Sequence, residues 1–210
     1  MTVLLTMRED IAGLKGEELD SISKNWIFLL NKLNAEFVLC PNLLSISKLY
    51  IDRYNISKIV LTGGGDVFES FIENETKRQT VENYLIEISI LKKIPLFGIC
   101  RGMQVINNYF GGSKKLIEGH SGTFHEISLL NTEKVSSKSF IVNSFHDEGI
   151  TLDSISADLE VTALSNEKLV EAFSHKKFSI FGQMWHPERK TPNLMANEFF
   201  FEFLDSNFKK

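Results

Sequence analysis

The 210-residue chain contains only two cysteines and four prolines. Two cysteines cannot build the framework of several disulfides that staples small secreted domains, and the low count fits a reducing cytoplasm, where we expect the protein to reside. No proline- or glycine-rich linker, internal repeat or low-complexity segment divides the chain. Its length suits one compact domain over residues 1–210.

Long runs of one charge and long hydrophobic runs are also absent. Lys and Arg number 23 against 27 Asp and Glu, a formal net charge of −4, which argues against a nucleic-acid or anionic-membrane partner. No stretch is long enough to span a bilayer. The first residues lead directly into a short strand-like run without a charged leader, so we expect no signal peptide.

Short apolar runs alternate with helix-like stretches along the chain. This alternation predicts an α/β fold with a mostly parallel central sheet covered by helices on both faces. The predicted strands are residues 3–6, 37–39, 58–62, 95–99 and 178–184. Apolar residues at helical spacing predict buried faces; they are Trp26, Leu29, Leu30 and Leu33, then Val81, Leu85, Ile88 and Leu91, and finally Phe199, Phe200, Phe203 and Leu204. Residues 111–150 instead have glycine, serine and short alternating runs, which predict a small antiparallel β lobe over the site.

Residues 98–104 read Gly-Ile-Cys-Arg-Gly-Met-Gln directly after an apolar run. This pattern is typical of a nucleophile elbow, where a strand turns sharply into a helix and small residues flank the nucleophile. Cys100 is therefore the expected nucleophile, because a helix N-terminus and a nearby imidazolium both favour the thiolate. Cys40, beside Pro41, is expected to be a small buried residue.

A base and an anion-binding loop complete the pattern. In the His-Pro-Glu segment, an extended backbone would point His186 and Glu188 to one face, so that Glu188 could orient His186. The N–H of Arg101 and those of the glycine run at 62–66, including Gly64 and Gly65, could hold an oxyanion. Taken alone, such a run is structural or phosphate-binding just as often, although no Lys follows to make a P-loop.

These motifs, in this order, resemble class I glutamine amidotransferases. Further segments resemble the gamma-glutamyl hydrolase branch that includes gamma-glutamyl-gamma-aminobutyrate hydrolase: Arg78 with Glu82, Gly111-Gly112, Val142 to His146, and Glu171-Ala172. The resemblance implies a single flavodoxin-like catalytic domain, a Cys100–His186–Glu188 triad and a gamma-glutamyl thioester that water resolves. It also implies glutamyl-holding roles for Gln104, Ser144, Phe145 and His146. Gln104 lies one helical turn beyond Cys100, on the same face.

The chain departs from this branch at two places and in length. Gln183 and Met184 stand where members of this branch usually have Val-Gln, and Asn166-Glu167 stands where Asp-Gly is common. The chain is also shorter than typical members of the branch. Compact, Lys- and Asn-rich members of this kind resemble the hydrolases of gamma-glutamyl-CDP-amidate in capsule phosphoramidate synthesis. That compound is therefore a candidate substrate.

Three classes of function remain open from the sequence. The expected one is a hydrolase that releases glutamate from a small-molecule gamma-glutamyl conjugate, acting alone or as a homodimer and without a cofactor. The others are a glutaminase subunit that supplies ammonia to a partner synthase, and a catalytically silent binding protein.

No metal is expected, because the histidines and cysteines lack close paired spacing. His120, His125 and His175 are assigned to the surface or to polar networks, His146 to the pocket wall. Arg8 could contact an anionic leaving group or be solvated.

Overall fold

The computed structural model describes residues 2–12, 16–67, 76–130 and 139–205. The strands are β1 Thr2–Thr6, β2 Arg8–Ala12, β3 Glu17–Ser21, β4 Glu36–Cys40, β5 Ile56–Leu61, β6 Leu96–Ile99, β7 Lys115–Leu116, β8 Ser121–Leu129, β9 Ser139–Phe145, β10 Glu148–Thr151, β11 Leu159–Ser165, β12 Leu169–His175 and β13 Ile180–Gln183. The helices are α1 Lys24–Lys32, α2 Leu44–Arg53, α3 Lys77–Lys92, α4 Arg101–Tyr109, α5 Glu198–Leu204 and the 3₁₀ turn η1 Leu194–Asn197.

The five strands expected from apolar runs form the parallel half of the central sheet. Their order is β4-β1-β5-β6-β13, and every neighbouring pair is parallel. β1, β5, β6 and β13 are almost wholly buried, as strands covered on both faces should be. Because β5, β6 and β13 lie side by side, their carboxyl ends bring the glycine run, the elbow and the His-Pro-Glu segment to one edge of the sheet.

The rest of the sheet is antiparallel and includes strands of the small antiparallel β lobe expected over residues 111–150, so the central sheet is partly parallel. β12 pairs antiparallel with β13, and the sheet continues through β11, β8 and β9. Only a short connection joins β12 to β13, and a short connection allows antiparallel but not parallel pairing. The fold is thus α/β with a mixed central sheet. Residues 131–138 of the expected lobe lie outside the described residues.

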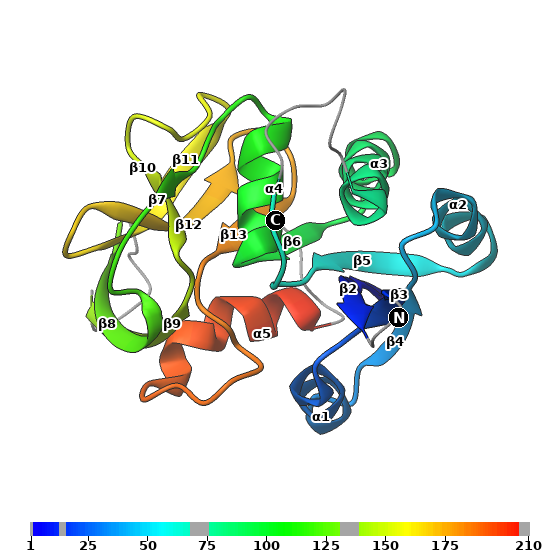
Figure 1. The fold of residues 1–210 in the computed structure, drawn as a ribbon, viewed down its shortest axis with the longest axis horizontal. Coiled ribbons are helices and arrows are strands. Elements are labelled where there is room, and N and C mark those ends of the chain that lie inside the picture. The colour runs from blue at the N-terminus through cyan, green and yellow to red at the C-terminus, as the bar shows by residue number, and fades with distance from the viewer. Residues whose placement is uncertain (1, 13–15, 68–75, 131–138, 206–210) are drawn as a thin grey trace.

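Helices cover both faces of the parallel half. Figure 1 shows α1 and α5 on one face and α2, α3 and α4 on the other. The expected buried faces hold for most positions, but Leu91 is 67% exposed. α3 instead buries polar groups beside Val81 and Leu85, namely Arg78 and Glu82. The expectation for Leu91 was wrong, because the spacing of hydrophobic residues cannot show that charged residues form part of a buried helix face.

A two-stranded sheet, β2 paired with β3, lies off the main sheet. The sequence did not predict it, because its residues are mostly charged. Asn42 anchors it by donating from its backbone N–H and its Nδ2 to the Asp20 carboxylate, at 2.9 and 2.6 Å. This hairpin places Arg8 next to the carboxyl edge of the parallel strands.

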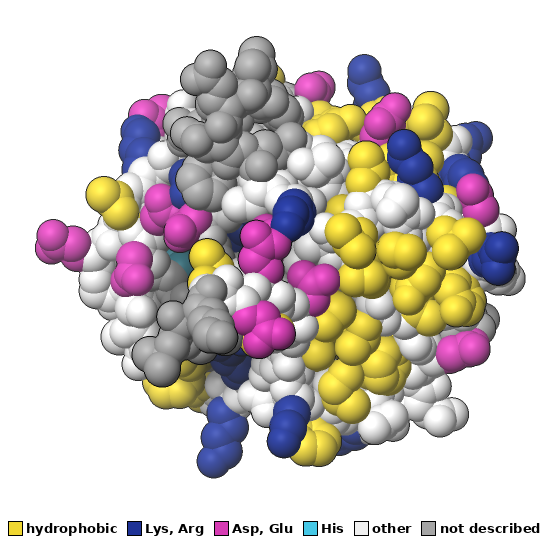
Figure 2. All heavy atoms as spheres, turned by 45° about the vertical axis from the view of Figure 1, so that its right-hand side comes forward, with side chains coloured by type: hydrophobic (Ala, Val, Ile, Leu, Met, Phe, Trp, Pro, Cys, Tyr) yellow, Lys and Arg dark blue, Asp and Glu magenta, His cyan; other side chains and the backbone are white. Residues whose placement is uncertain are grey.

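Figure 2 shows a broad group of hydrophobic side chains on the side of the molecule that carries α1 and α2. The large exposed hydrophobic residues in and around these helices are Phe28, Leu43, Leu49 and Tyr54. None of the described helices combines the length and the apolar character needed to cross a bilayer.

Aromatic side chains from β6, β13 and α5 form a cluster in the core. The Phe97 ring lies 5.1 Å from the rings of both Phe200 and Phe203, measured between centroids. Phe200 and Phe203 are fully buried, whereas Phe199 is 45% exposed. α5 is therefore held to the sheet mainly through the first two residues.

We expect Phe200→Ala to lower the free energy of unfolding by about 3–5 kcal/mol, because it opens a cavity in this cluster. Phe199→Ala is the matched control from the same helix and should cost less than half as much. Urea denaturation followed by circular dichroism measures both. The Phe199 ring also contacts the cluster, 5.0 Å from the Phe181 ring between centroids, so equal losses would mean that the degree of burial does not set how strongly each ring holds α5.

Candidate active site

Cys100 lies at the turn between β6 and α4, in a strained backbone conformation. Its φ is 52° and its ψ is −109°, which for a non-glycine residue costs about 1–3 kcal/mol. The turn is fixed because the Cys100 N–H donates to the Gln183 carbonyl of β13 at 2.8 Å. A Cβ on Gly98 would lie 2.5 Å from the Gly102 backbone, and a Cβ on Gly102 would lie 2.2 Å from the Leu61 oxygen. The local geometry matches that of a nucleophile elbow.

His186 and Glu188 lie together beyond the end of β13. His186 Nδ1 is 2.7 Å from Glu188 Oε1, and both side chains are buried. Asn143 on β9 holds the backbone of His186, since its Oδ1 accepts from the His186 N–H and its Nδ2 donates to the His186 carbonyl, each at 2.9 Å. A Cβ built on Gly63 would lie 2.7 Å from His186 Cε1 and 3.3 Å from Cys100 Cβ. The imidazole and the cysteine therefore converge over Gly63.

The two cysteines have opposite electrostatic surroundings. Burial disfavours charge on His186, but its interactions with Cys100 and with Glu188 outweigh burial and raise the pKa of His186 to about 9. The imidazole is thus charged at neutral pH, and this charge favours a thiolate on Cys100. Burial raises the pKa of the Cys40 thiol to about 11, against a hydrogen bond to Ser47. Cys40 is fully buried, as expected.

The glycine run after β5 is held by two buried arginines. Arg78 donates through Nη1 to the Gly64 carbonyl at 2.5 Å and through Nη2 to the Thr62 carbonyl at 2.6 Å. Arg101 donates through Nε to the Asp66 carbonyl at 2.7 Å. The arginines therefore fix the loop carbonyls, and Gly64 and Gly65 line the cavity together with Arg101.

Glu82 of α3 joins the two arginines. Arg78 Nε donates to Glu82 Oε1 at 2.9 Å, and Arg101 Nη1 contacts Glu82 Oε2. Burial would raise the pKa of Glu82, but the charges and hydrogen bonds of Arg101 and Arg78 hold it below its usual value. Burial lowers the pKa of Arg78 to about 10. All three side chains are almost wholly buried, so each depends on the others for its counter-charge.

Most of the expected site residues line one cavity of about 340 Å³. They are Gly64, Gly65, Cys100, Arg101, Gln104, Phe145, His146 and His186. Glu188 lies behind His186. Ser144 is not among the lining residues, because its hydroxyl turns away and donates to the His120 carbonyl at 2.5 Å. Gln104 Nε2 donates to the Glu148 carbonyl at 2.9 Å.

The sequence did not single out several residues of this site. Arg189, Asp147 and Glu148 also line the cavity. The Arg189 guanidinium carbon lies 4.2 Å from the centre of the Phe145 ring. Arg189 follows Glu188 directly, so proximity to the His-Pro-Glu segment was the available signal. Asn143 lies within the segment that resembled the hydrolase branch, but its bonds to His186 are visible only in three dimensions.

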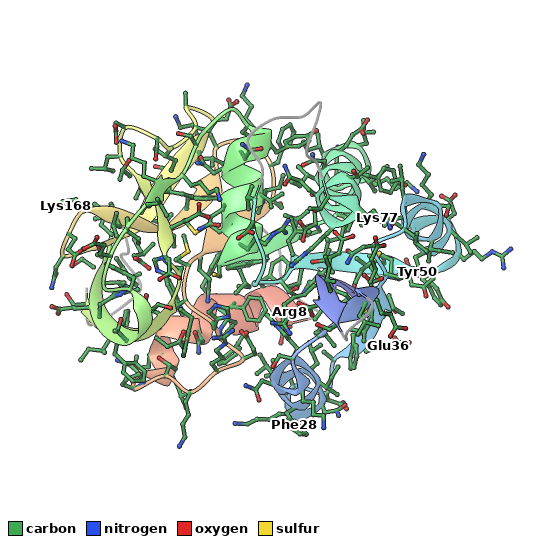
Figure 3. The ribbon with its side chains drawn as sticks, viewed as in Figure 1. Arg8, Phe28, Glu36, Tyr50, Lys77 and Lys168 are labelled. Atoms are coloured by element: carbon green, nitrogen blue, oxygen red, sulfur yellow. The ribbon has the colours of Figure 1, made fainter. Side chains whose placement is uncertain are left out.

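Arg8 comes from the separate hairpin and packs on the glycine run. A Cβ on Gly64 would lie 2.5 Å from Arg8 Cδ, and Arg8 Nη2 donates to the Ser21 hydroxyl at 3.2 Å. Figure 3 shows Arg8 near the middle of the molecule, whereas Phe28 and Tyr50 lie at its outer edge. Its partly exposed guanidinium is therefore next to the loop that lines the cavity.

Comparisons with known proteins show the family to which the chain belongs. A model of the family described as "Glutamine amidotransferase class-I" matches residues 17–206. The chain therefore belongs to the class I glutamine amidotransferase family and is an amidohydrolase of that class. It is 36% identical over 176 residues to gamma-glutamyl-CDP-amidate hydrolase of Campylobacter jejuni subsp. jejuni serotype O:2, covering 83% of each chain.

Two further comparisons place it more broadly. The chain is 38% identical over 126 residues to the carbamoyl phosphate synthase small chain of Bacillus cereus, covering 58% of this chain and 33% of that one. A crystal structure of a glutamine amidotransferase from Thermotoga maritima has a TM-score of 0.65 at 20% identity, covering 89% of this chain and 76% of the other. The latter supports the fold.

We expect iodoacetamide to alkylate Cys100 far faster than Cys40 at pH 7. The reason is that His186 stays charged up to about pH 9 and stabilises the thiolate, whereas the Cys40 thiol stays protonated. In His186→Gln, alkylation of Cys100 at pH 7 should be slower, because the charged imidazole beside the sulfur is gone. Peptide mass spectrometry measures both rates. Equal labelling of the two cysteines would contradict the assigned electrostatics.

We expect Glu82→Gln to lower the free energy of unfolding by about 3–5 kcal/mol at pH 7, because it leaves two buried guanidinium groups without a counter-charge. Glu87→Gln, an exposed position on the same helix, is the control. Since the pKa of Glu82 is lowered, its stabilisation is present above the ordinary carboxyl pKa and is lost as the pH falls through the lowered value. The difference in the free energy of unfolding between wild type and Glu82→Gln should therefore become smaller at acidic pH. If this stability difference stays constant with pH, the stabilisation by Glu82 does not come from its charge.

Proposed function

We propose that this protein is a cysteine-dependent hydrolase of a gamma-glutamyl amide, which releases L-glutamate from a small-molecule conjugate. The observation that carries the proposal is the convergence of Cys100, at a strained elbow, with the His186–Glu188 pair at one cavity beside the glycine run. In this proposal Cys100 is the nucleophile, His186 transfers protons and Glu188 orients His186.

The first half of the reaction forms a thioester. The Cys100 thiolate attacks the γ-carbonyl carbon, and the carbonyl oxygen becomes an oxyanion held by the N–H groups of Arg101 and of Gly64 or Gly65. Collapse of this intermediate breaks the C–N bond. The His186 imidazolium donates its proton to the leaving nitrogen, and the amine product departs.

The second half returns the enzyme to its starting state. Neutral His186 now takes a proton from water, whose oxygen attacks the thioester carbon. The C–S bond breaks, glutamate leaves and the imidazolium–thiolate pair is restored. Gln104, Phe145 and His146 line the cavity and are proposed to hold the glutamyl group, with Gln104 using its amide as a hydrogen-bond partner.

For the leaving group we propose CDP-amidate. The C. jejuni hydrolase of that conjugate is 36% identical over 83% of both chains. The proposal is supported by two guanidinium groups near the site, because phosphates need counter-charges: Arg189 lines the cavity, and Arg8 packs beside Gly64.

The second candidate is a glutaminase subunit that supplies ammonia to a synthase. The similarity to a carbamoyl phosphate synthase small chain favours it. The chain spans only a third of that protein, which weakens the case for the same assembly. The two candidates differ in substrate: the hydrolase cleaves a conjugate unaided, and the subunit cleaves free glutamine.

We expect the purified protein to release glutamate from gamma-glutamyl-CDP-amidate and far more slowly from free glutamine or gamma-glutamyl-aminobutyrate. Glutamate release measured with a coupled dehydrogenase tests this, with Cys100→Ala as the blank. If the aminobutyrate conjugate is hydrolysed faster than gamma-glutamyl-CDP-amidate, aminobutyrate would take the place of CDP-amidate as the proposed leaving group. Turnover of glutamine alone would favour the subunit.

We expect Glu188→Gln to lower kcat by about two to four orders of magnitude without unfolding the protein, because an amide cannot hold the imidazole in the required tautomer. Glu160→Gln on β11, an exposed position, is the matched control and should keep wild-type activity. A Glu188→Gln variant with near-normal kcat would show that Glu188 does not orient the base.

A further inference from the structure

Behind the cavity wall, four titratable side chains from distant segments meet. His120 precedes β8, His125 belongs to β8, His146 follows β9 and Glu171 belongs to β12. Ligand atoms of His120, His146 and Glu171 all lie within 4.8 Å of one another, and these three residues are buried. The His125 Nε2 lies 3.3 Å from Glu171 Oε1. Of these groups, the proposed reaction uses only His146, which lines the cavity and is proposed to help hold the glutamyl group.

The cluster contains lone pairs and charge without hydrogen-bond partners. Among the described residues, His120 Nδ1, His146 Nε2 and both Glu171 oxygens are buried and make no hydrogen bond. Burying a carboxylate and imidazole nitrogens without partners is costly. Such a group of atoms, all directed into one space, indicates that something else binds there.

In His120 and His146, the ring nitrogen that points away from the cluster (the outer nitrogen) has a polar partner, as is usual for metal-bound histidines. His120 Nε2 lies 3.1 Å from Glu167 Oε2, and His146 Nδ1 lies 3.0 Å from the Glu148 carbonyl oxygen. Each of these contacts needs a proton on the outer nitrogen, and in the neutral imidazole this leaves the inner nitrogen with a free lone pair.

We propose that His120 Nδ1, His146 Nε2 and the Glu171 carboxylate bind a divalent transition-metal ion, with Zn²⁺ the ion that suits the set. Two imidazoles and a carboxylate are established zinc ligands, and His125 lies beside the set, with its Nε2 3.3 Å from Glu171 Oε1. Tetrahedral ligands stand roughly 3.4 Å apart at bond lengths of about 2.1 Å, so the side chains close by about an ångström on the ion. Sequence spacing gave no sign of the site, because its ligands lie on separate segments.

The ion would act on the cavity through His146. This residue lines the cavity, and its neighbours Phe145 and Glu148 line it too. A metal bond to His146, combined with bonds to the β8 segment and to β12, ties the turn between β9 and β10 to the central sheet. The ion is therefore a structural element that shapes the substrate wall, and it takes no part in bond breaking.

The first test is Co²⁺ binding to the metal-stripped wild-type protein, followed by visible absorption and by calorimetry with Zn²⁺. We expect one equivalent of metal, d–d bands of a low-coordinate site and a raised Tm that EDTA reverses. His120→Gln and Glu171→Gln should lose the bands. Glu167→Gln changes a 70% exposed side chain, leaves the ligands intact and should weaken Zn²⁺ binding about 10–100-fold.

Cys100 and His186 are the competing metal ligands in the protein. The Cys100→Ala, His186→Gln double variant removes them, and we expect it to keep the full Co²⁺ spectrum without any sulfur-to-metal charge-transfer band. Circular dichroism of each variant checks folding. The proposal fails if wild type takes up no ion, or if uptake disappears in the double variant but persists in His120→Gln. Neither readout uses substrate, so the result is independent of the proposed hydrolase activity.

Discussion

The site depends on the buried charge network of Arg78, Glu82 and Arg101. The two arginines hold the carbonyls of the glycine run, and Glu82 supplies the counter-charge that lets both stay buried. Thr6 extends the network to β1, since its hydroxyl donates to Glu82 and accepts from the Thr62 N–H. A network of this kind is expensive to desolvate and adds little net stability. What it provides is a loop of fixed shape beside the cysteine.

Much of the parallel half was predictable, because strands buried on both faces must be short, apolar and separated by helices. The antiparallel half was harder. Its strands alternate between polar and apolar residues, which is a weaker signal than a continuous apolar run. In addition, nothing in the sequence indicates that β12 pairs with β13 in the same sheet. The hairpin β2–β3 escaped prediction because its charged residues carry no hydrophobic period. Leu91 fitted a helical stripe, but the buried face of α3 is set by Arg78 and Glu82.

For the site, the sequence was informative where a function needs adjacent residues. The elbow around Cys100 and the spacing of His186 and Glu188 are local, so their geometry follows from a few bonds. Contacts between distant segments were not readable: Asn143 holding the His186 backbone, Arg189 over Phe145, and the meeting of His120, His146 and Glu171. These depend on the order of strands in the sheet, and no pattern within one segment records that order.

The position of β13 has a consequence for how the protein is made. This strand is inserted between β6 and β12 in the sheet, although it is the last strand along the described residues. While the chain is being synthesised, β6 has no neighbour on that side, and Cys100 emerges long before His186. The thiol therefore lacks its charged partner until the C-terminal segment has been released and docked. Chain order alone therefore delays the meeting of Cys100 with His186.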